Sequence, residues 1–200
     1  MKLANDVKHS TALIDTYPAI ADRLHIGMAS VYSDTGGRTP RDVIRRVVTA
    51  YHEAGHAFWA HQLGFRIVFV SIIPDAVTLG RVRATDWVLD HVAANQPERL
   101  VEAVTASLGV KLGGPLAELV LQPGKNRRIG NDYAAARAIL RYANIPDLDK
   151  VEVLARAELS VLRGLERYWG AVCALAEALL EAGIVDGRQA HRILAAAMAV

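Results

Sequence analysis

The sequence predicts a mainly α-helical fold, a helical bundle or array that carries a small β-ribbon. Most of the chain from residue 40 onward has apolar residues at helical spacing or residues typical of helix ends. Only residues 65–86 have the β-branched and turn-forming composition of short strands. The 200 residues, of which 52% are hydrophobic and 22% charged, suit one globular domain with a real core.

The first predicted helix runs from Pro40 to about Gly64. Thr39 suits the N-cap, Pro40 fits the first helical position, and Asp42 lies at the positive end of the helix dipole. Gly64 is a natural C-terminal stop. At about 100° per residue, six residues fall on one stripe that has to pack on a core. They are Ile44, Val47, Val48, Tyr51, Gly55 and Phe58.

Two strands and five further helices are predicted after this helix. Residues 65–74 form a strand, and residues 77–86 form a second one after a turn at Asp75 and Ala76. A helix from Pro97 to about Val110 precedes another at 112–121, which starts after a glycine pair. Helices at 131–142, at 148–183 and at 186–198 follow, and the long one is expected to be interrupted at Gly164 or Gly170.

The predicted domain covers residues 40–200, and residues 1–39 form an N-terminal extension. The extension has short apolar patches broken by turn residues and ends in the connector-like sequence SDTGGRTP at 33–40. It could cover the active site, cap the helices or mediate assembly.

Composition excludes several classes of protein. The formal net charge of +2 is too small to indicate a nucleic-acid or membrane-surface binder. The basic residues Lys125, Arg127 and Arg128 suit a solvated loop. Cys173 is the single cysteine, so the chain has no internal disulfide and no cysteine-based zinc cluster. Without a signal peptide or an uncharged apolar run of about 18 residues, we expect a cytoplasmic protein with no membrane anchor.

The sequence HEAGH at 52–56 carries the chemistry. His52 and His56 are four residues apart, so on a helix both imidazoles project from one face and can bind one ion. Glu53 is rotated by about 100° and can reach a metal-bound water instead of the metal. A carboxylate beside such a water removes its proton as the oxygen attacks a carbonyl. The alternative is an ordinary helix whose histidines happen to have this spacing.

Two histidines need a third protein ligand. His61 cannot supply it, because it lies about 160° around the helix from the other two, and a surface position is expected for it. The extended metzincin motif is absent, since its later positions are Trp59 and Gln62. The ligand must come from downstream, and spacing alone leaves four candidates open: Glu102, Glu118, Asp132 and His191.

Several segments resemble the peptidase domain of the FtsH-type ATP-dependent zinc metalloproteases. TAYHEAGHA is similar to their zinc-binding helix, and VSIIPDAVTLGRV, LGGPLAELVL, GNDYAAARAIL and ALAEALLEAGIVDGRQAHRIL are similar to four later segments in the family's order. The similarity covers about residues 40–195. It implies that Asp132 is the third zinc ligand and that Glu118 supports a ligand or a helix end from behind. On the residues alone, Asp132 or Asn131 would be a helix N-cap and Glu118 a plain surface residue.

The chain also departs from the family pattern. Pro115 replaces an arginine, Leu119 replaces a second glutamate, and Tyr133 begins a YAAA sequence where the family has acidic and amide residues. The 200 residues contain no Walker A sequence. The resemblance therefore implies a peptidase domain without its own ATPase module.

The predicted function is a zinc-dependent metalloendopeptidase that hydrolyses unfolded or flexible polypeptides. His52, His56 and Asp132 would hold Zn²⁺, and Glu53 would act as general base. The peptide would add as a strand beside residues 67–73. The alternative is a catalytically quiet or partner-dependent metal-binding module that needs an ATPase in trans or acts as a regulator. A homo-oligomer is compatible with either function.

Overall fold

The computed structural model describes residues 40–85, 99–122, 130–144 and 146–199. In these ranges the order of elements is α3, β1, β2, α5, α6, α7, β3, α8, which gives five helices and three short strands. The predicted mainly α-helical fold with a small β element is therefore confirmed. Thr39, the expected extension at 1–39 and the basic residues at 125–128 lie outside the described ranges.

Helix α3 (Pro40–Gln62) is the central element of the fold. It packs against α5 and α7 and also against strands β1 and β2. Its second half is buried on nearly every side, so the core covers more of it than the predicted stripe. The helix ends as predicted, because Gly64 has a positive φ of 71° and the amide of Phe65 then donates to the carbonyl of Ala60.

The three strands form one antiparallel sheet with the order β2–β1–β3. Strand β1 (Ile67–Ser71) lies in the middle, flanked by β2 (Arg81–Ala84) and β3 (Ile184–Asp186). The sequence did not predict β3, because three residues between two helices carry too little pattern. The expected addition of a peptide beside residues 67–73 is wrong, because both edges of β1 are already paired within the sheet.

Helix α5 (Leu100–Leu121) is one continuous helix, so the predicted break at the glycine pair is wrong. The glycines serve a close helix crossing instead. A Cβ atom on Gly113 would lie 2.5 Å from the carbonyl oxygen of Gly55 on α3. Pro115 lies inside the helix two residues further on. The small residues at 113 and 55 thus allow the two helix backbones to approach each other, which brings α5 against the HEAGH face of α3.

The remaining helices agree with the predicted ones in position. Helix α6 (Asn131–Tyr142) matches its prediction, and α7 (Asp147–Ala182) is one long element with non-helical dihedral angles at Tyr168. That kink lies between the two glycines at which the interruption was expected. Helix α8 (Gly187–Met198) is capped by Asp186, which accepts hydrogen bonds from the amides of Arg188 and Gln189.

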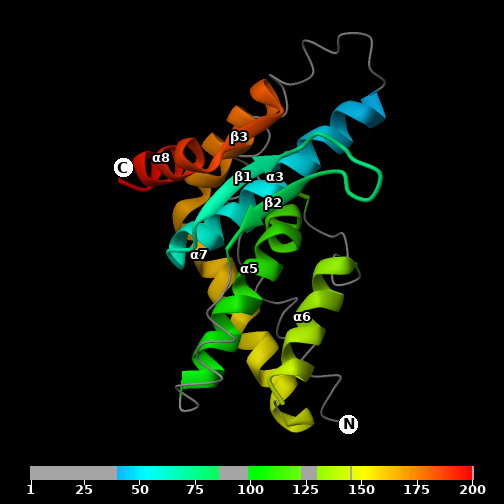
Figure 1. The fold of residues 1–200 in the computed structure, drawn as a ribbon, viewed down its shortest axis with the longest axis vertical. Helices are drawn as coiled ribbons and strands as arrows, with labels where there is room; N and C mark the ends of the chain where they lie inside the picture. Colours follow the sequence, from blue (N-terminus) through cyan, green and yellow to red (C-terminus); the bar gives the residue numbers. More distant parts are fainter. Residues whose placement is uncertain (1–39, 86–98, 123–129, 145, 200) are drawn as a thin grey trace.

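The elements are distributed along an elongated molecule (Figure 1). The sheet and α8 lie toward one end, and α6 with the first half of α7 extends toward the other. Arg46 of α3 donates to the carbonyl oxygen of Leu180 at 2.7 Å, which fastens the first helix to the end of α7. The HEAGH residues of α3 lie where the β1–β2 hairpin, α5 and the start of α6 come together.

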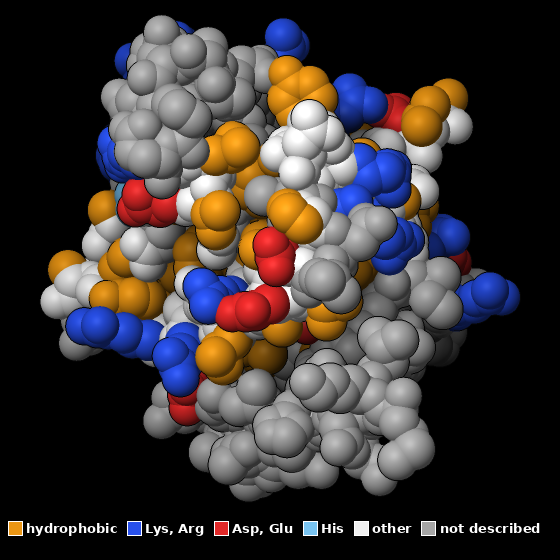
Figure 2. Space-filling model, turned by 90° about the horizontal axis from the view of Figure 1, so that it is seen from below, with side chains coloured by type: hydrophobic (Ala, Val, Ile, Leu, Met, Phe, Trp, Pro, Cys, Tyr) orange, Lys and Arg blue, Asp and Glu red, His pale blue; other side chains and the backbone are white. Residues whose placement is uncertain are grey.

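Two features, the burial of helix α5 and the distribution of surface charge, concern the predictions about membrane and nucleic-acid binding. Helix α5 is, among the described residues, the one helix long and apolar enough to cross a membrane, and 61% of its most apolar window is buried in the fold. Packing against α3 and α7 gives these residues a place in the core. On the face shown in Figure 2, basic side chains are interspersed with hydrophobic and acidic ones.

Candidate metal centre

Two histidines of α3 and an aspartate of α6 meet at one point. The Nε2 atoms of His52 and His56 are 2.9 Å apart. The carboxylate of Asp132 lies 3.2 Å from the Nε2 atom of His52 and 3.5 Å from that of His56. One ligand atom from each residue lies within 4.8 Å of the others, a spacing compatible with a metal ion. Two neutral imidazoles and a carboxylate are a ligand set that zinc accepts.

Asp132 reaches this point because it lies in the first turn of α6. The N-cap of that helix is Gly130, and no side chain caps it, so neither Asn131 nor Asp132 has the capping role considered from the sequence. The carboxylate of Asp132 turns toward α3 instead. The positive end of the α6 dipole favours a negative charge at this position, and so does the pair of imidazoles in front of it.

Each histidine is oriented by a hydrogen bond at its second ring nitrogen, Nδ1. The Nδ1 atom of His52 lies 2.6 Å from the carboxylate of Glu118, and that of His56 lies 2.6 Å from the carbonyl oxygen of Val110. Both acceptors belong to α5. An Nδ1–H that donates to such a group leaves the Nε2 lone pair directed at the common point. The Glu118 side chain is only 14% exposed and contacts His52, so it is not a solvated surface residue.

Two glycines, which the sequence did not single out as part of the site, leave space beside the imidazoles and beside Glu53. A Cβ atom on Gly114 would lie 2.4 Å from the Nε2 atom of His56 and 2.7 Å from that of His52. A Cβ atom on Gly80 would lie 2.6 Å from a carboxylate oxygen of Glu53. The glycine pair in LGGP is visible in the sequence, but such a pair is equally typical of a helix break and of a close helix crossing.

Glu53 borders the cleft that contains these groups. The cleft has a volume of about 480 Å³ and is lined by α3, the β1–β2 hairpin, α5 and the start of α6. The residue is only 6% exposed, and burial raises the pKa of its carboxyl group. The charges of His56 and His52 oppose this rise, while those of Asp132 and Glu118 add to it. A carboxyl with a raised pKa beside a ligand cluster has the properties of a general base.

The charges of the cluster depend on one another. Burial would lower the pKa of His52, but hydrogen bonds to Asp132 and Glu118 outweigh this and raise the pKa to about 10. Burial would raise the pKa of Asp132, but the hydrogen bonds from His52 and His56 hold it well below its usual range. A proton on His52 and the negative charge on Asp132 therefore stabilise each other.

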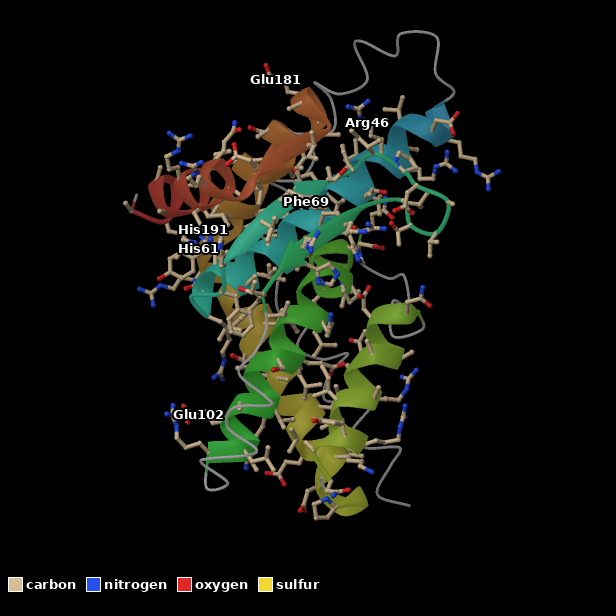
Figure 3. The ribbon with its side chains drawn as sticks, viewed as in Figure 1. Arg46, His61, Phe69, Glu102, Glu181 and His191 are labelled. Carbon is tan, nitrogen blue, oxygen red and sulfur yellow. The ribbon has the colours of Figure 1, made fainter. Side chains whose placement is uncertain are left out.

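The other candidate ligands lie elsewhere. Glu102 is near the far end of α5, where it pairs with Arg99 (Figure 3). His191 of α8 lies beside His61, with 2.7 Å between their Nδ1 atoms (Figure 3). His61 is partly exposed, which agrees with the expected surface position, and its ring contacts that of His191. The amide of Ile67 donates to the Nε2 atom of His191 at 3.3 Å. This bond places the shared proton on the Nδ1 atom of His191, which donates it to His61.

Comparison with known proteins assigns no family. No protein-family model matches the chain, and no curated protein matches it. Any function therefore has to be argued from the residues and geometry described above.

Proposed function

We propose that the protein is a zinc-dependent metalloendopeptidase that hydrolyses unfolded or flexible polypeptides. The observation that carries the proposal is the convergence of three ligand atoms, from His52, His56 and Asp132, in a cleft that Glu53 also borders. The space left by the missing side chain of Gly114, directly in front of both Nε2 atoms, fits a bound ion. Zinc held there would supply Lewis acidity toward a water molecule and the peptide carbonyl.

Glu53 is the residue that moves protons in this proposal. It follows His52 directly on α3, so it borders the cleft without joining the ligand set. It would take a proton from the attacking water and later deliver it to the nitrogen of the leaving amine. The raised pKa of Glu53 brings its proton affinity closer to neutral pH, where both transfers are needed.

The hairpin gives the substrate a place to bind. Strand β2 lies at the outer side of the sheet, and no described strand pairs with its second edge. Residues 77–82 and Ala84 line the cleft beside Glu53. An extended peptide that added to this edge of β2 would pass in front of the ligand cluster, which replaces the edge of β1 expected from the sequence.

The resemblance to the FtsH-type zinc metalloproteases supports the same proposal. Asp132, which the resemblance assigns as the third ligand, is far from His52 and His56 in the sequence, yet its carboxylate lies beside both imidazoles in the fold. The contact between the Glu118 carboxylate and the Nδ1 atom of His52 supports the role that the resemblance implies for Glu118.

A second candidate is a partner-dependent module of the same ancestry. In this candidate an ATPase partner in trans would unfold folded substrates. In that case the cleft would be competent but would act only on chains delivered by the partner. Assembly into a homo-oligomer would be compatible with this arrangement.

Cleavage of an unstructured casein-like substrate tests the proposal. Wild-type protein and Glu53→Gln are compared at equal zinc loading, without any ATPase. We expect the wild type to cleave and the variant to lose about 10²-fold or more of the rate, because the general base is gone. Equal rates in both proteins, or no cleavage by either, would refute an autonomous peptidase. Cleavage that appears only with an added ATPase would favour the second candidate.

A further inference from the structure

We propose that Lys111 binds a carboxylate of the peptide substrate and thereby selects acidic sequences or chain ends. The inference rests on the proposed peptidase function and adds a substrate class to it. Lys111 lines the cleft that contains the ligand cluster, on the α5 wall. The resemblance assigns it no role.

The position of Lys111 relative to the cluster sets which part of a substrate it can reach. It follows Val110, whose carbonyl oxygen holds His56, and it precedes Gly114, which lies against both imidazoles. Three helical residues advance by about 4.5 Å along the axis. A peptide advances by about 3.3 Å per residue when it is extended. The ammonium group is thus placed to meet a substrate residue about one or two positions from the bond to be cut.

Lys111 has no partner among the residues that the structure describes. No described hydrogen bond or ion pair involves its ammonium group, although the side chain is partly buried. The other basic residue that lines the cleft, Arg81, is paired with Asp75. A substrate carboxylate in the cleft would therefore give the Lys111 ammonium group an ionic partner that the described residues do not supply.

The charges of the cleft are arranged along α5. Lys111 and Glu118 are seven residues apart, which is two helical turns, so they lie on the same face of α5 about 10 Å from each other. Glu118 is engaged with His52, and Asp132 with both histidines. The positive charge of Lys111 therefore favours a negatively charged substrate group at this end of the cleft. A peptide with one acidic residue would then bind in the direction that places this residue beside Lys111.

A carboxylate can come from two parts of a substrate, an internal Asp or Glu side chain or the free C-terminus. Both present the same two oxygens to an ammonium group. Short fluorescein-labelled peptides of equal length separate them. One has an internal glutamate and an amidated C-terminus, the second is neutral with a free C-terminus, and the third is neutral and amidated.

Binding is measured by fluorescence anisotropy with the full chain carrying Glu53→Gln, loaded with zinc, so that no peptide is cut. We expect the first or the second peptide to bind about tenfold more tightly than the third, equivalent to about 1.4 kcal/mol. Lys111→Met should abolish this preference, and Lys111→Glu should reverse it in favour of a peptide with an internal lysine. Arg163→Met, which removes an exposed charge from α7, is the matched control and should keep the preference.

Equal binding of the three peptides, or a preference that survives Lys111→Met, would overturn the inference. Zinc content and thermal unfolding of the Lys111 variants verify that the fold is intact. The outcome is separable from that of the peptidase proposal, because binding is measured on the inactive variant. Cleavage without a charge preference would refute the role of Lys111 alone, and a preference without cleavage would refute only the peptidase.

Discussion

Gly114 shows how a residue without a side chain can determine a site. The space in front of the two imidazoles exists because residue 114 has no Cβ atom, which would lie 2.4 Å from the Nε2 atom of His56. Such a contact is far shorter than van der Waals separation, so an added methyl group must displace the imidazoles or α5 itself.

We expect Gly114→Ala to weaken zinc binding by about tenfold or more while the helices remain folded. Equilibrium dialysis or calorimetry measures the affinity, and circular dichroism checks the helix content. Gly170→Ala is the matched control, because nothing lies within 4 Å of its added Cβ atom. The control should bind zinc normally and gain about 0.5–1 kcal/mol of stability from better helix propensity. Normal affinity in Gly114→Ala would show that the site has room to adjust.

The common direction of the His52 and His56 side chains could be predicted from the sequence, and their supporting contacts could not. The spacing of His52 and His56 determines which way both imidazoles point on any helix, so it required no knowledge of the fold. The roles of Val110 and Gly114 depend on how α5 crosses α3, and no local pattern encodes that crossing. Asp132 required the family resemblance, because a first-turn aspartate is equally typical of a helix start.

Helix α6 is the element that delivers the third candidate ligand, and a buried hydrogen bond helps to hold it. The hydroxyl group of Tyr133, directly after Asp132, donates to the carboxylate of Glu158 on α7 at 2.8 Å. Both residues are buried, with 2% and 7% of their surfaces exposed. The bond links the first turn of α6 to α7, next to Asp132, and so helps to position the Asp132 carboxylate.

We expect Tyr133→Phe to lower the free energy of unfolding by about 1–3 kcal/mol, since the buried carboxylate of Glu158 loses this donor. Zinc affinity should fall by several-fold as well, because the start of α6 is held less firmly. Urea unfolding of the zinc-free protein and zinc titration measure the two effects. Glu158→Gln keeps an acceptor for the hydroxyl group and should retain more affinity. An unchanged affinity in Tyr133→Phe would mean that α5 alone positions α6.

Predictions from the sequence succeeded for elements whose patterns are local. The long apolar periodicities of α3 and α7 and the β-branched run of β1 were sufficient to locate those elements. The continuity of α5 was not predicted, because Gly113, Gly114 and Pro115 are also typical of a break. Burial of this helix between α3 and α7 outweighs the low helix propensity of the three residues.

At the scale of the whole molecule, the ligand cluster couples metal binding, protonation and stability. The pKa of His52 in the zinc-free protein is about 10, against an ordinary value of 6.5. A raised pKa means that the folded state binds this proton more tightly than the unfolded state does. The resulting stabilisation is fully present below about pH 6.5 and is lost as the pH rises toward 10.

We therefore expect the zinc-free protein to become less stable between pH 7 and pH 9.5, as measured by the midpoint of urea unfolding. His52→Gln should show a much weaker dependence in this range. Saturating zinc should remove the dependence, because the ion binds the deprotonated imidazole and supplies the positive charge itself. A zinc-free wild type with the same pH profile as His52→Gln would contradict the proposed coupling.

The pairing of β3 with the middle strand has a consequence for when the molecule matures. Val70, near the end of β1, pairs with Val185, which is made more than 100 residues later in the chain. Ribosomal synthesis therefore produces α3, β1 and β2 long before β3 exists to cover the second edge of β1. Because pairing between such distant segments is slow to form, we expect the three-stranded sheet to be completed only after α7 has been made.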